Sequence, residues 1–376
     1  MVIRRYGRRQ CINPTARLFV LVVCVCTLLP EVARTNPGAG QSKIAEEGDS
    51  RLLSDVSSEG WRPLRRSFPL AEEQMEVLLW VPPGMEQNDA IGAIRSAQRW
   101  AEHLMLRFDE KDRERALWRL NAKAGHEGVQ LAPEVFFVLS EAKRIALISN
   151  GAYDPTSAQL ERLWDVRRCN CLPQDSQLES ALSKTGVTDL WLEPASRRAG
   201  LAQTGQSLSI ASLAMAYVMD GVASRLSARG FAHYLVQLNG GVLAGKGPPE
   251  RKWRLGLQDP RAPGHFAIWE LSEAAVMTTG DYFRFVMWDQ KRVHNVVDPR
   301  TGKPASEVRS VSLRAKSALE AKALSQAFFV LGPDKGLDML ARIQEGGAVW
   351  VDAENRVGTS DGVAKSLTFR PPTDGP

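Results

Sequence analysis

Apolar residues recur at three- and four-residue steps in four segments of this chain, a spacing that gathers side chains on one face of an α-helix. Three of these segments run up to a glycine or an Asn-Gly pair, which commonly ends a helix. The predicted helices span Ala90–Phe108, Pro133–Ser149, the segment from about Leu213 to the stop at Gly230, and Ala318–Leu331 before Gly332.

Alternating or short continuous apolar runs predict strands between and after these helices. The predicted strands are Met75–Val81, Tyr234–Leu238, Trp253–Leu257, Ala275–Thr278, Phe283–Trp288, Arg309–Leu313 and Ala348–Val351. Helices and strands do not alternate regularly, and the chain carries no repeat, no GxGxxG and no phosphate-binding lysine loop. The pattern favours a single α+β domain with mostly antiparallel strands.

The amino terminus has a different character from the rest of the chain. Its arginines precede an apolar run of about 12 residues, Leu18–Leu29, and Ala33 offers a small residue for cleavage. A stable membrane-spanning helix needs about 20 apolar residues, so residues 1–33 are interpreted as a signal peptide. We expect an exported protein, either periplasmic or anchored to the outer face of the inner membrane.

Two further features concern the leader and the segment behind it. Cys24 or Cys26 could carry a lipid anchor, although Val23 and Val25 precede them where a lipidation motif has a small residue. Residues 34–65 are rich in Gly, Ser and charge, which predicts a flexible linker. The folded domain is expected over residues 66–370.

The positive net charge belongs mostly to the leader. Five arginines against Glu31 give residues 1–33 a charge of +4 out of a formal total of +5, which leaves +1 for the remainder. Because no later cluster of Lys or Arg with interleaved aromatics is present, we expect no nucleic-acid partner. Cys169 and Cys171 are interpreted as small loop residues, with a redox pair as the alternative.

Three groups of short motifs follow one another along the chain. The first comprises Arg119-Leu120-Asn121, Gly151-Ala152-Tyr153-Asp154-Pro155-Thr156 and Leu163-Trp164. The second comprises Ala216-Tyr217-Val218-Met219-Asp220, Val236–Gly241 (VQLNGG) and Trp253–Pro260 (WRLGLQDP). The third comprises Thr279-Gly280-Asp281-Tyr282, His294–Gly302 (HNVVDPRTG) and Phe329–Gly332.

Read in this order, the motifs resemble the FAD:protein FMN transferases, also called ApbE-type flavin transferases, over about Phe68 to Val351. The resemblance implies a T-fold-like α+β domain. It also implies transfer of FMN from FAD to a threonine of an exported or membrane redox protein, with release of AMP. FAD would be a substrate, and the partner would be an acceptor protein that carries the target threonine.

The resemblance further implies roles for individual residues. Ala152, Tyr153 and Asp154 would lie along the flavin nucleotide, with Val296 and Asp298 also at the cofactor, and His294 would act as acid or base beside the pyrophosphate. The alternatives from the residues alone are that His294 caps backbone groups, that Asp154 and Asp298 only form turns, and that Tyr153 belongs to the core.

The chain departs from the family where a metal is expected. The family's metal-binding Asp and Thr correspond to Lys322 and Gln326, which share one helix face, and a lysine cannot ligate Mg²⁺. Ser212 falls where some members use a hydroxyl ligand, or it simply begins a helix. The use of Mg²⁺ is therefore left open.

Lys322 admits two interpretations. Its ammonium could offset the pyrophosphate charge directly in place of a divalent ion and so bind FAD, or it could be a solvated helix residue. Accordingly, the alternative to an active transferase is a degenerate family member that only binds FAD or a protein partner.

Overall fold

The computed structural model describes residues 60–165, 171–238, 240–344 and 346–369. These residues belong to one compact unit, Gly38–Pro376. The expected signal peptide, both candidate lipid-bearing cysteines and most of the expected linker lie outside the described residues. Within the described ranges, no helix combines the length and apolarity that crossing a membrane requires.

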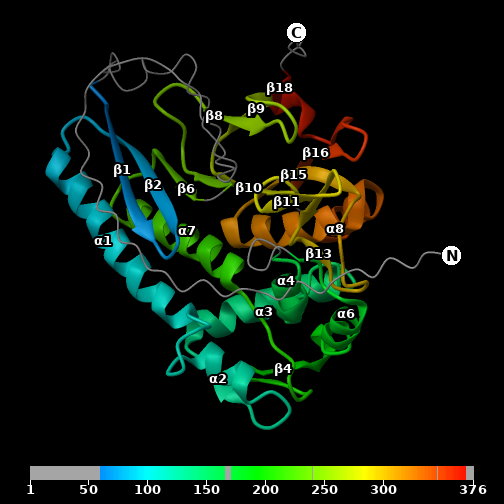
Figure 1. Ribbon diagram of the computed structural model, residues 1–376. Helices are drawn as coiled ribbons and strands as arrows, with labels where there is room; N and C mark the ends of the chain where they lie inside the picture. The colour runs from blue at the N-terminus through cyan, green and yellow to red at the C-terminus, as the bar shows by residue number, and fades with distance from the viewer. Residues whose placement is uncertain (1–59, 166–170, 239, 345, 370–376) are drawn as a thin grey trace, which may run out of the picture. The chain divides into compact units, whose positions relative to one another are not determined.

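An eight-stranded antiparallel sheet forms the centre of the domain, in the order β1-β2-β6-β7-β10-β15-β16-β17 (Figure 1). Its strands are β1 (Arg62–Leu70), β2 (Glu73–Val81), β6 (Tyr234–Leu238), β7 (Gly241–Ala244), β10 (Ala274–Gly280), β15 (Val308–Ala315), β16 (Gly347–Asp352) and β17 (Val357–Thr359). Together with the helices this confirms the α+β class and the antiparallel sheet.

Strand β1 begins at Arg62, four residues before the domain boundary that composition predicts. It contains Pro63 and Pro69, which cannot donate to a ladder and are tolerated because β1 is an edge strand. The outward-facing arginines obscure its strand pattern in the sequence, although Leu64, Phe68 and Leu70 are buried.

Three long helices cover one face of this sheet (Figure 1). They are α1 (Gln87–Met105), α7 (Ala211–Ala228) and α8 (Ala318–Ile343). Alternate strand residues enter the core beneath them: Val77 and Leu79 of β2, for example, share the main apolar cluster with the helices. Successive side chains of a strand point to opposite faces of the sheet, so alternate residues reach the helices.

The opposite face of the sheet packs against a second, three-stranded sheet of order β18-β9-β8. Its strands are β8 (Trp253–Gln258), β9 (His265–Leu271) and β18 (Leu367–Phe369). Trp80 of β2 and Val276 of β10 point into this second core, where they meet Trp253 and the fully buried Trp269.

The remaining segments lie beyond the carboxyl-terminal half of α1 or in the connections of the sheets (Figure 1). The helices are α2 (Ala116–Ala122), α3 (Pro133–Ile148), α4 (Ala158–Leu163) and α6 (Asp175–Leu182), with 3₁₀ turns at Leu106–Phe108, Pro155–Ser157, Val187–Asp189 and Ala364–Ser366. The short strands are β3 (Val129–Gln130), β4 (Leu190–Glu193), β5 (Arg198–Leu201), β11 (Phe285–Trp288), β12 (Lys291–His294), β13 (Val297–Asp298) and β14 (Lys303–Pro304).

All four predicted helices are present, with small differences at their ends. Gly332 has a φ of +76° and interrupts α8, after which a second helical segment starts at Pro333 and runs to Ile343. The sequence therefore predicts the break at Gly332 correctly, because a positive φ there requires a residue without a side chain.

Candidate functional site

Segments that carry the first and third motif groups meet in space. The Trp164 indole Nε1 donates to the Gly302 carbonyl at 2.7 Å. Leu160, of the short helix α4, shares a small apolar cluster with Val297 of β13. The GAYDPT…LW segment and the HNVVDPRTG segment thus form one locality, although more than a hundred residues separate them.

Asp154 is fully engaged by its own protein. Its Oδ1 accepts from the Thr156 backbone N (2.8 Å) and the Thr156 hydroxyl (2.7 Å), and its Oδ2 accepts from the Val187 backbone N at 2.8 Å. Burial raises its pKa, an effect these hydrogen bonds oppose. The contacts are those of a turn and cap residue, and a contact with a nucleotide stays a prediction.

Ala152 and Tyr153 are buried beside it and belong to the main core. The pKa of the Tyr153 phenol is raised well above its usual value, first by burial and then by the nearby carboxylates of Glu161, Asp154 and Glu110. The structure therefore brings the predicted nucleotide residues together with two acidic side chains that the sequence analysis did not identify.

His294 ends strand β12 and is buried. One ring nitrogen, Nε2, contacts the Ala305 carbonyl at 3.1 Å, and the other, Nδ1, accepts from the Val296 backbone N at 3.3 Å. These partners define a neutral tautomer with the proton on Nε2. Burial lowers the pKa of the imidazole, which Asp281 partly offsets. The ring is thus neutral near pH 7, in a form that can accept a proton.

The turn after His294 is held by an internal ion pair. The Asp298 carboxylate accepts from the backbone N of Arg300 and from its guanidinium at 2.8–2.9 Å, and this pairing raises the pKa of Arg300. The Asp298 carbonyl accepts from the backbone N–H groups of Thr301 and Gly302. Val296 is half-buried, and its carbonyl accepts from the Ala305 backbone N at 3.0 Å.

One face of helix α8 carries Lys322, Gln326 and Phe329, which are four and three residues apart. Phe329 meets the His294 ring edge-on, with ring centroids 5.8 Å apart. The exposed Ser212 hydroxyl, on α7, donates to Gln326 Oε1 at 3.4 Å, so it serves a side chain rather than the helix backbone. This face of α8 therefore connects the start of α7 to His294.

The donors at the positions implied for a metal do not fit Mg²⁺. They comprise one ammonium, one amide and one hydroxyl, whereas Mg²⁺ takes a near-octahedral set of hard oxygens with at least one or two carboxylates. Throughout the described ranges, no group of three or more His, Cys, Asp and Glu is arranged to hold a metal. We derive no step through a divalent ion.

The structure gives Lys322 two charged neighbours from distant segments. Its pKa is lowered to about 8, chiefly because protein replaces water around the ammonium and then because of Arg284, while Glu161 acts in the opposite direction. Glu161 has a raised pKa for the same dominant reason, and its Oε1 accepts from the Ser157 hydroxyl at 3.0 Å. Part of the Glu161 side chain is nonetheless exposed to solvent.

Glu161 is the functional candidate that the sequence analysis missed. It lies on α4 between the GAYDPT and LW motifs, so its position was available in the sequence. Its proximity to Lys322, however, depends on how α4 and α8 pack, which no local pattern reveals.

Three polar side chains position the elements of the site. Asp220 of α7 accepts from the backbone N of Ala318 (2.7 Å) and Leu319 (3.0 Å) and so caps the start of α8. Asn121 pairs with both backbone groups of Leu208, and Glu110 accepts from Ile210 N at 2.8 Å. These contacts explain why RLN and the terminal Asp of AYVMD accompany the other motifs.

A second charged group lies near His294. Asp281 is held by both terminal nitrogens of Arg261, at 2.8 and 2.5 Å, and Arg292 Nη1 lies 3.6 Å from its Oδ1. Two guanidiniums around one carboxylate leave an excess of positive charge.

Separately, Cys171 is disulfide-bonded, which corrects its interpretation as a small loop residue.

Known proteins resemble this chain along most of its length. An FAD:protein FMN transferase of Treponema pallidum (strain Nichols) is 28% identical over 335 residues, which cover 83% of this chain and 92% of the relative. The protein of the same name from Escherichia coli (strain K12) is 27% identical over 280 residues, which cover 69% and 78%.

Solved structures share the fold. The flavin transferase ApbE from Vibrio cholerae superimposes with a TM-score of 0.73 at 21% identity, covering 81% of this chain and 99% of the other. The ApbE protein from Thermotoga maritima gives a TM-score of 0.71 at 24% identity, with the same coverage. The sequence profile of the ApbE family matches residues 74–350, well over half of the 376 residues. This chain belongs to the ApbE family.

Proposed function

We propose that this chain transfers FMN from FAD to a threonine hydroxyl of an acceptor protein and releases AMP. Relatives named FAD:protein FMN transferase that cover most of the chain support the flavin transfer. The observation that carries the proposal for this chain is the convergence of its separate motif segments, joined by the Trp164–Gly302 hydrogen bond and by the packing of Leu160 on Val297.

In the proposed reaction the threonine oxygen attacks the FMN phosphorus of FAD. A new P–O bond forms, the bond from that phosphorus to the bridging oxygen breaks, and AMP leaves with this oxygen and the electron pair. The hydroxyl proton passes to a base, for which we propose Nδ1 of His294. This nitrogen holds only a long contact of 3.3 Å with Val296, and the lowered pKa keeps the ring neutral.

The test combines binding with product analysis on the purified full chain. FAD binding is measured by calorimetry, and mass spectrometry then follows a threonine-containing peptide for the added mass of FMN, with a Thr→Ala peptide as the control. We expect adduct only on the threonine peptide. His294→Ala should bind FAD but form no adduct, whereas His103→Ala, which changes an exposed histidine of α1, should behave as wild type.

A second function has a specific observation in its favour. Both His294 nitrogens already contact backbone groups, and the expected metal positions do not fit a metal, as a protein that binds FAD without reacting would tolerate. FAD binding without adduct formation would establish this alternative. Absence of FAD binding would refute both functions.

We further propose that the protein is exported through residues 1–33 and acts at the periplasmic face of the inner membrane on its acceptor. The arginine-rich start and the short apolar run of the leader support this. Fractionation followed by mass spectrometry of the mature amino terminus is the test. A start at Arg34 indicates a released protein, a lipid on Cys24 or Cys26 indicates an anchor, and an intact Met1 in the cytoplasm refutes export.

A further inference from the structure

The ammonium of Lys322 is presented by a well-anchored part of helix α8. The Lys322 carbonyl accepts from the Ser325 hydroxyl at 2.9 Å, and Ser325 in turn pairs with the Thr279 hydroxyl of β10 at 2.9 Å. These contacts fix the turn of helix against the central sheet. Across the described ranges, Nζ itself donates no hydrogen bond and forms no ion pair.

The charges around Lys322 come from two other segments of the chain. Arg284, just before β11, adds a second positive charge, and its guanidinium reaches Glu73 Oε1 at 3.5 Å while staying half exposed. Glu161 on α4 supplies one carboxylate, and Arg284 acts on it as well as on Lys322. Arg284 therefore has Glu73 beside it, and Glu161 is the carboxylate that acts on Lys322.

An ammonium that is surrounded by protein and has no hydrogen-bond or ion-pair partner is unfavourable unless an anion binds to it. Phosphate oxygens supply such a partner, because lysine binds phosphate as a point charge through short charge-assisted hydrogen bonds. The same face of α8 continues through Gln326 to Phe329 at His294, so an anion held at Lys322 lies on the side of the helix that faces the proposed base.

We propose that Lys322, together with Arg284, binds the pyrophosphate of FAD directly, and that this site works without a divalent metal ion. When the site is empty, Glu161 offsets the charge of Lys322 and Glu73 pairs with Arg284. The inference rests on the proposed function, since FAD is the ligand that brings a pyrophosphate to the site. It also accounts for the lack of fit to Mg²⁺, because the fixed charge of the protein takes over the neutralising role.

The experiment measures FAD affinity of the purified full chain by calorimetry, in EDTA and again in excess Mg²⁺. We expect the two dissociation constants to agree within about twofold. Lys322→Met removes the charge but keeps most of the side-chain length, and should weaken FAD binding by about 10- to 100-fold, the range for loss of one charge-assisted hydrogen bond. Riboflavin, which has no phosphate, should bind both proteins equally.

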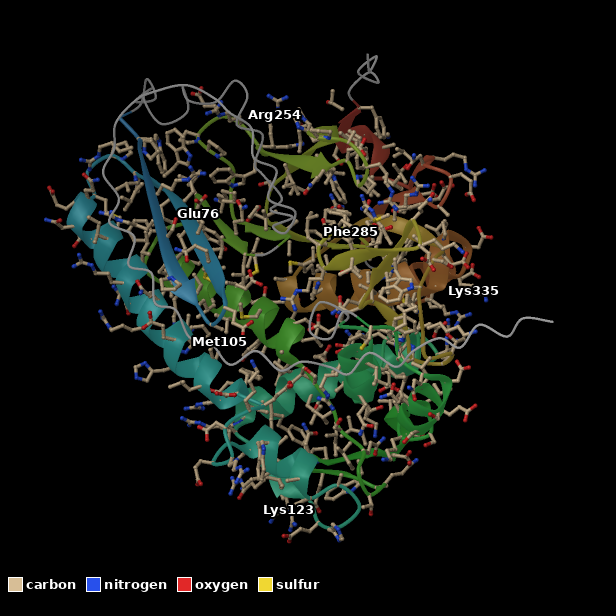
Figure 2. The ribbon with its side chains drawn as sticks, in the orientation of Figure 1. Glu76, Met105, Lys123, Arg254, Phe285 and Lys335 are labelled. Atoms are coloured by element: carbon tan, nitrogen blue, oxygen red, sulfur yellow. The ribbon has the colours of Figure 1, made fainter. Side chains whose placement is uncertain are left out.

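Two further variants sharpen the result. Lys335→Met changes an exposed lysine farther along α8, which points outward in Figure 2, and should leave FAD affinity unchanged. Lys322→Asp places a hard oxygen donor on the same face and should bind FAD weakly in EDTA but be rescued by Mg²⁺.

The proposal is overturned if wild-type binding requires Mg²⁺, or if Lys322→Met binds FAD as tightly as wild type. A loss of riboflavin binding in Lys322→Met would mean general damage to the site and would also count against it. Metal-free binding without FMN transfer refutes the transferase but leaves this inference standing, whereas transfer that needs Mg²⁺ refutes the inference alone.

Discussion

Lys322 holds its proton less firmly than an ordinary lysine, because protein surrounds it and Arg284 repels it, although Glu161 favours the charged form. With a pKa of about 8, the ammonium is mostly charged at pH 7 and mostly neutral by pH 9. We therefore expect FAD affinity to fall by about tenfold as the pH rises through 8. Calorimetric titrations from pH 6.5 to about 9.5 measure this change.

Arginine is the matched control for this titration, because its guanidinium stays charged over the whole range. Lys322→Arg should bind FAD with an affinity that is flat across pH 8. An equal alkaline fall in Lys322→Arg would assign the effect to another group and contradict the prediction.

His294 affects activity at the acid end of the pH range, whereas Lys322 affects FAD binding at the alkaline end. Its pKa lies below the usual 6.5, mainly through burial, so the neutral base persists to lower pH than in a free histidine. FMN transfer should therefore keep its rate down to pH 6.5 and decline only below it. The pH profile of kcat/KM shows this limb, and a decline that begins above pH 7 would exclude His294 as the base.

At the scale of elements, Asp220 links α7 to α8, because its carboxylate accepts hydrogen bonds from the first two backbone N–H groups of α8. Removing an acceptor from a helix start typically costs about 0.5–2 kcal/mol. Asp220→Ala should lower the free energy of unfolding by about that amount, as chemical denaturation would measure. Asp220→Asn keeps one acceptor oxygen and should lose less.

The same carboxyl gives a pH signature. Burial raises its pKa from 3.8 to about 6, so the folded state binds a proton more readily than the unfolded state between these values. Its contribution to stability is therefore present below about pH 3.8 and is lost as the pH rises through 6. The advantage in melting temperature of wild type over Asp220→Asn should shrink from pH 4 to pH 7, and an increase would contradict the assignment.

The variant Gly332→Ala tests whether the break in α8 depends on glycine. Its φ is +76°, and a Cβ there would stand 2.9 Å from Glu307 Cβ. Gly332→Ala should destabilise the fold by about 1–3 kcal/mol. Gly92→Ala is the control, because Gly92 lies inside α1 with no atom within 4 Å of an added Cβ, and should be neutral or slightly stabilising. Equal melting temperatures for the two variants would refute the strain argument.

Elements of this kind are visible in the sequence because their causes are local. The helical spacing in Ala318–Leu331 and the glycine stop both act within a few residues, and both appear in α8. The first four residues of β1, Arg62–Arg65, fall in the expected linker, because arginines and a proline replace the usual strand pattern there. Its place at the sheet edge, which permits those residues, depends on the other strands.

At the scale of the whole molecule, the motif order was enough to predict the family but not the contacts within the site. Asp154, Asp298 and His294 occupy the expected segments, yet each satisfies neighbouring groups of its own chain. The partner of Lys322 could not be predicted, because Glu161 approaches it only after α4 packs beneath the HNVVDPRTG turn. Long-range packing of this kind produces no periodic pattern in the sequence.

That long-range proximity is itself measurable. In a double-mutant cycle, Glu161→Gln and Lys322→Gln should each change the free energy of unfolding, and the double variant should differ from their sum by about 0.5 kcal/mol. We place the coupling at the low end because Glu161 is exposed and solvent screens the pair. The same cycle with Lys335→Gln in place of Lys322→Gln should show no coupling. If both cycles gave the same value, Glu161 would not face Lys322, and Lys322 would lack the counterion proposed for it when FAD is absent.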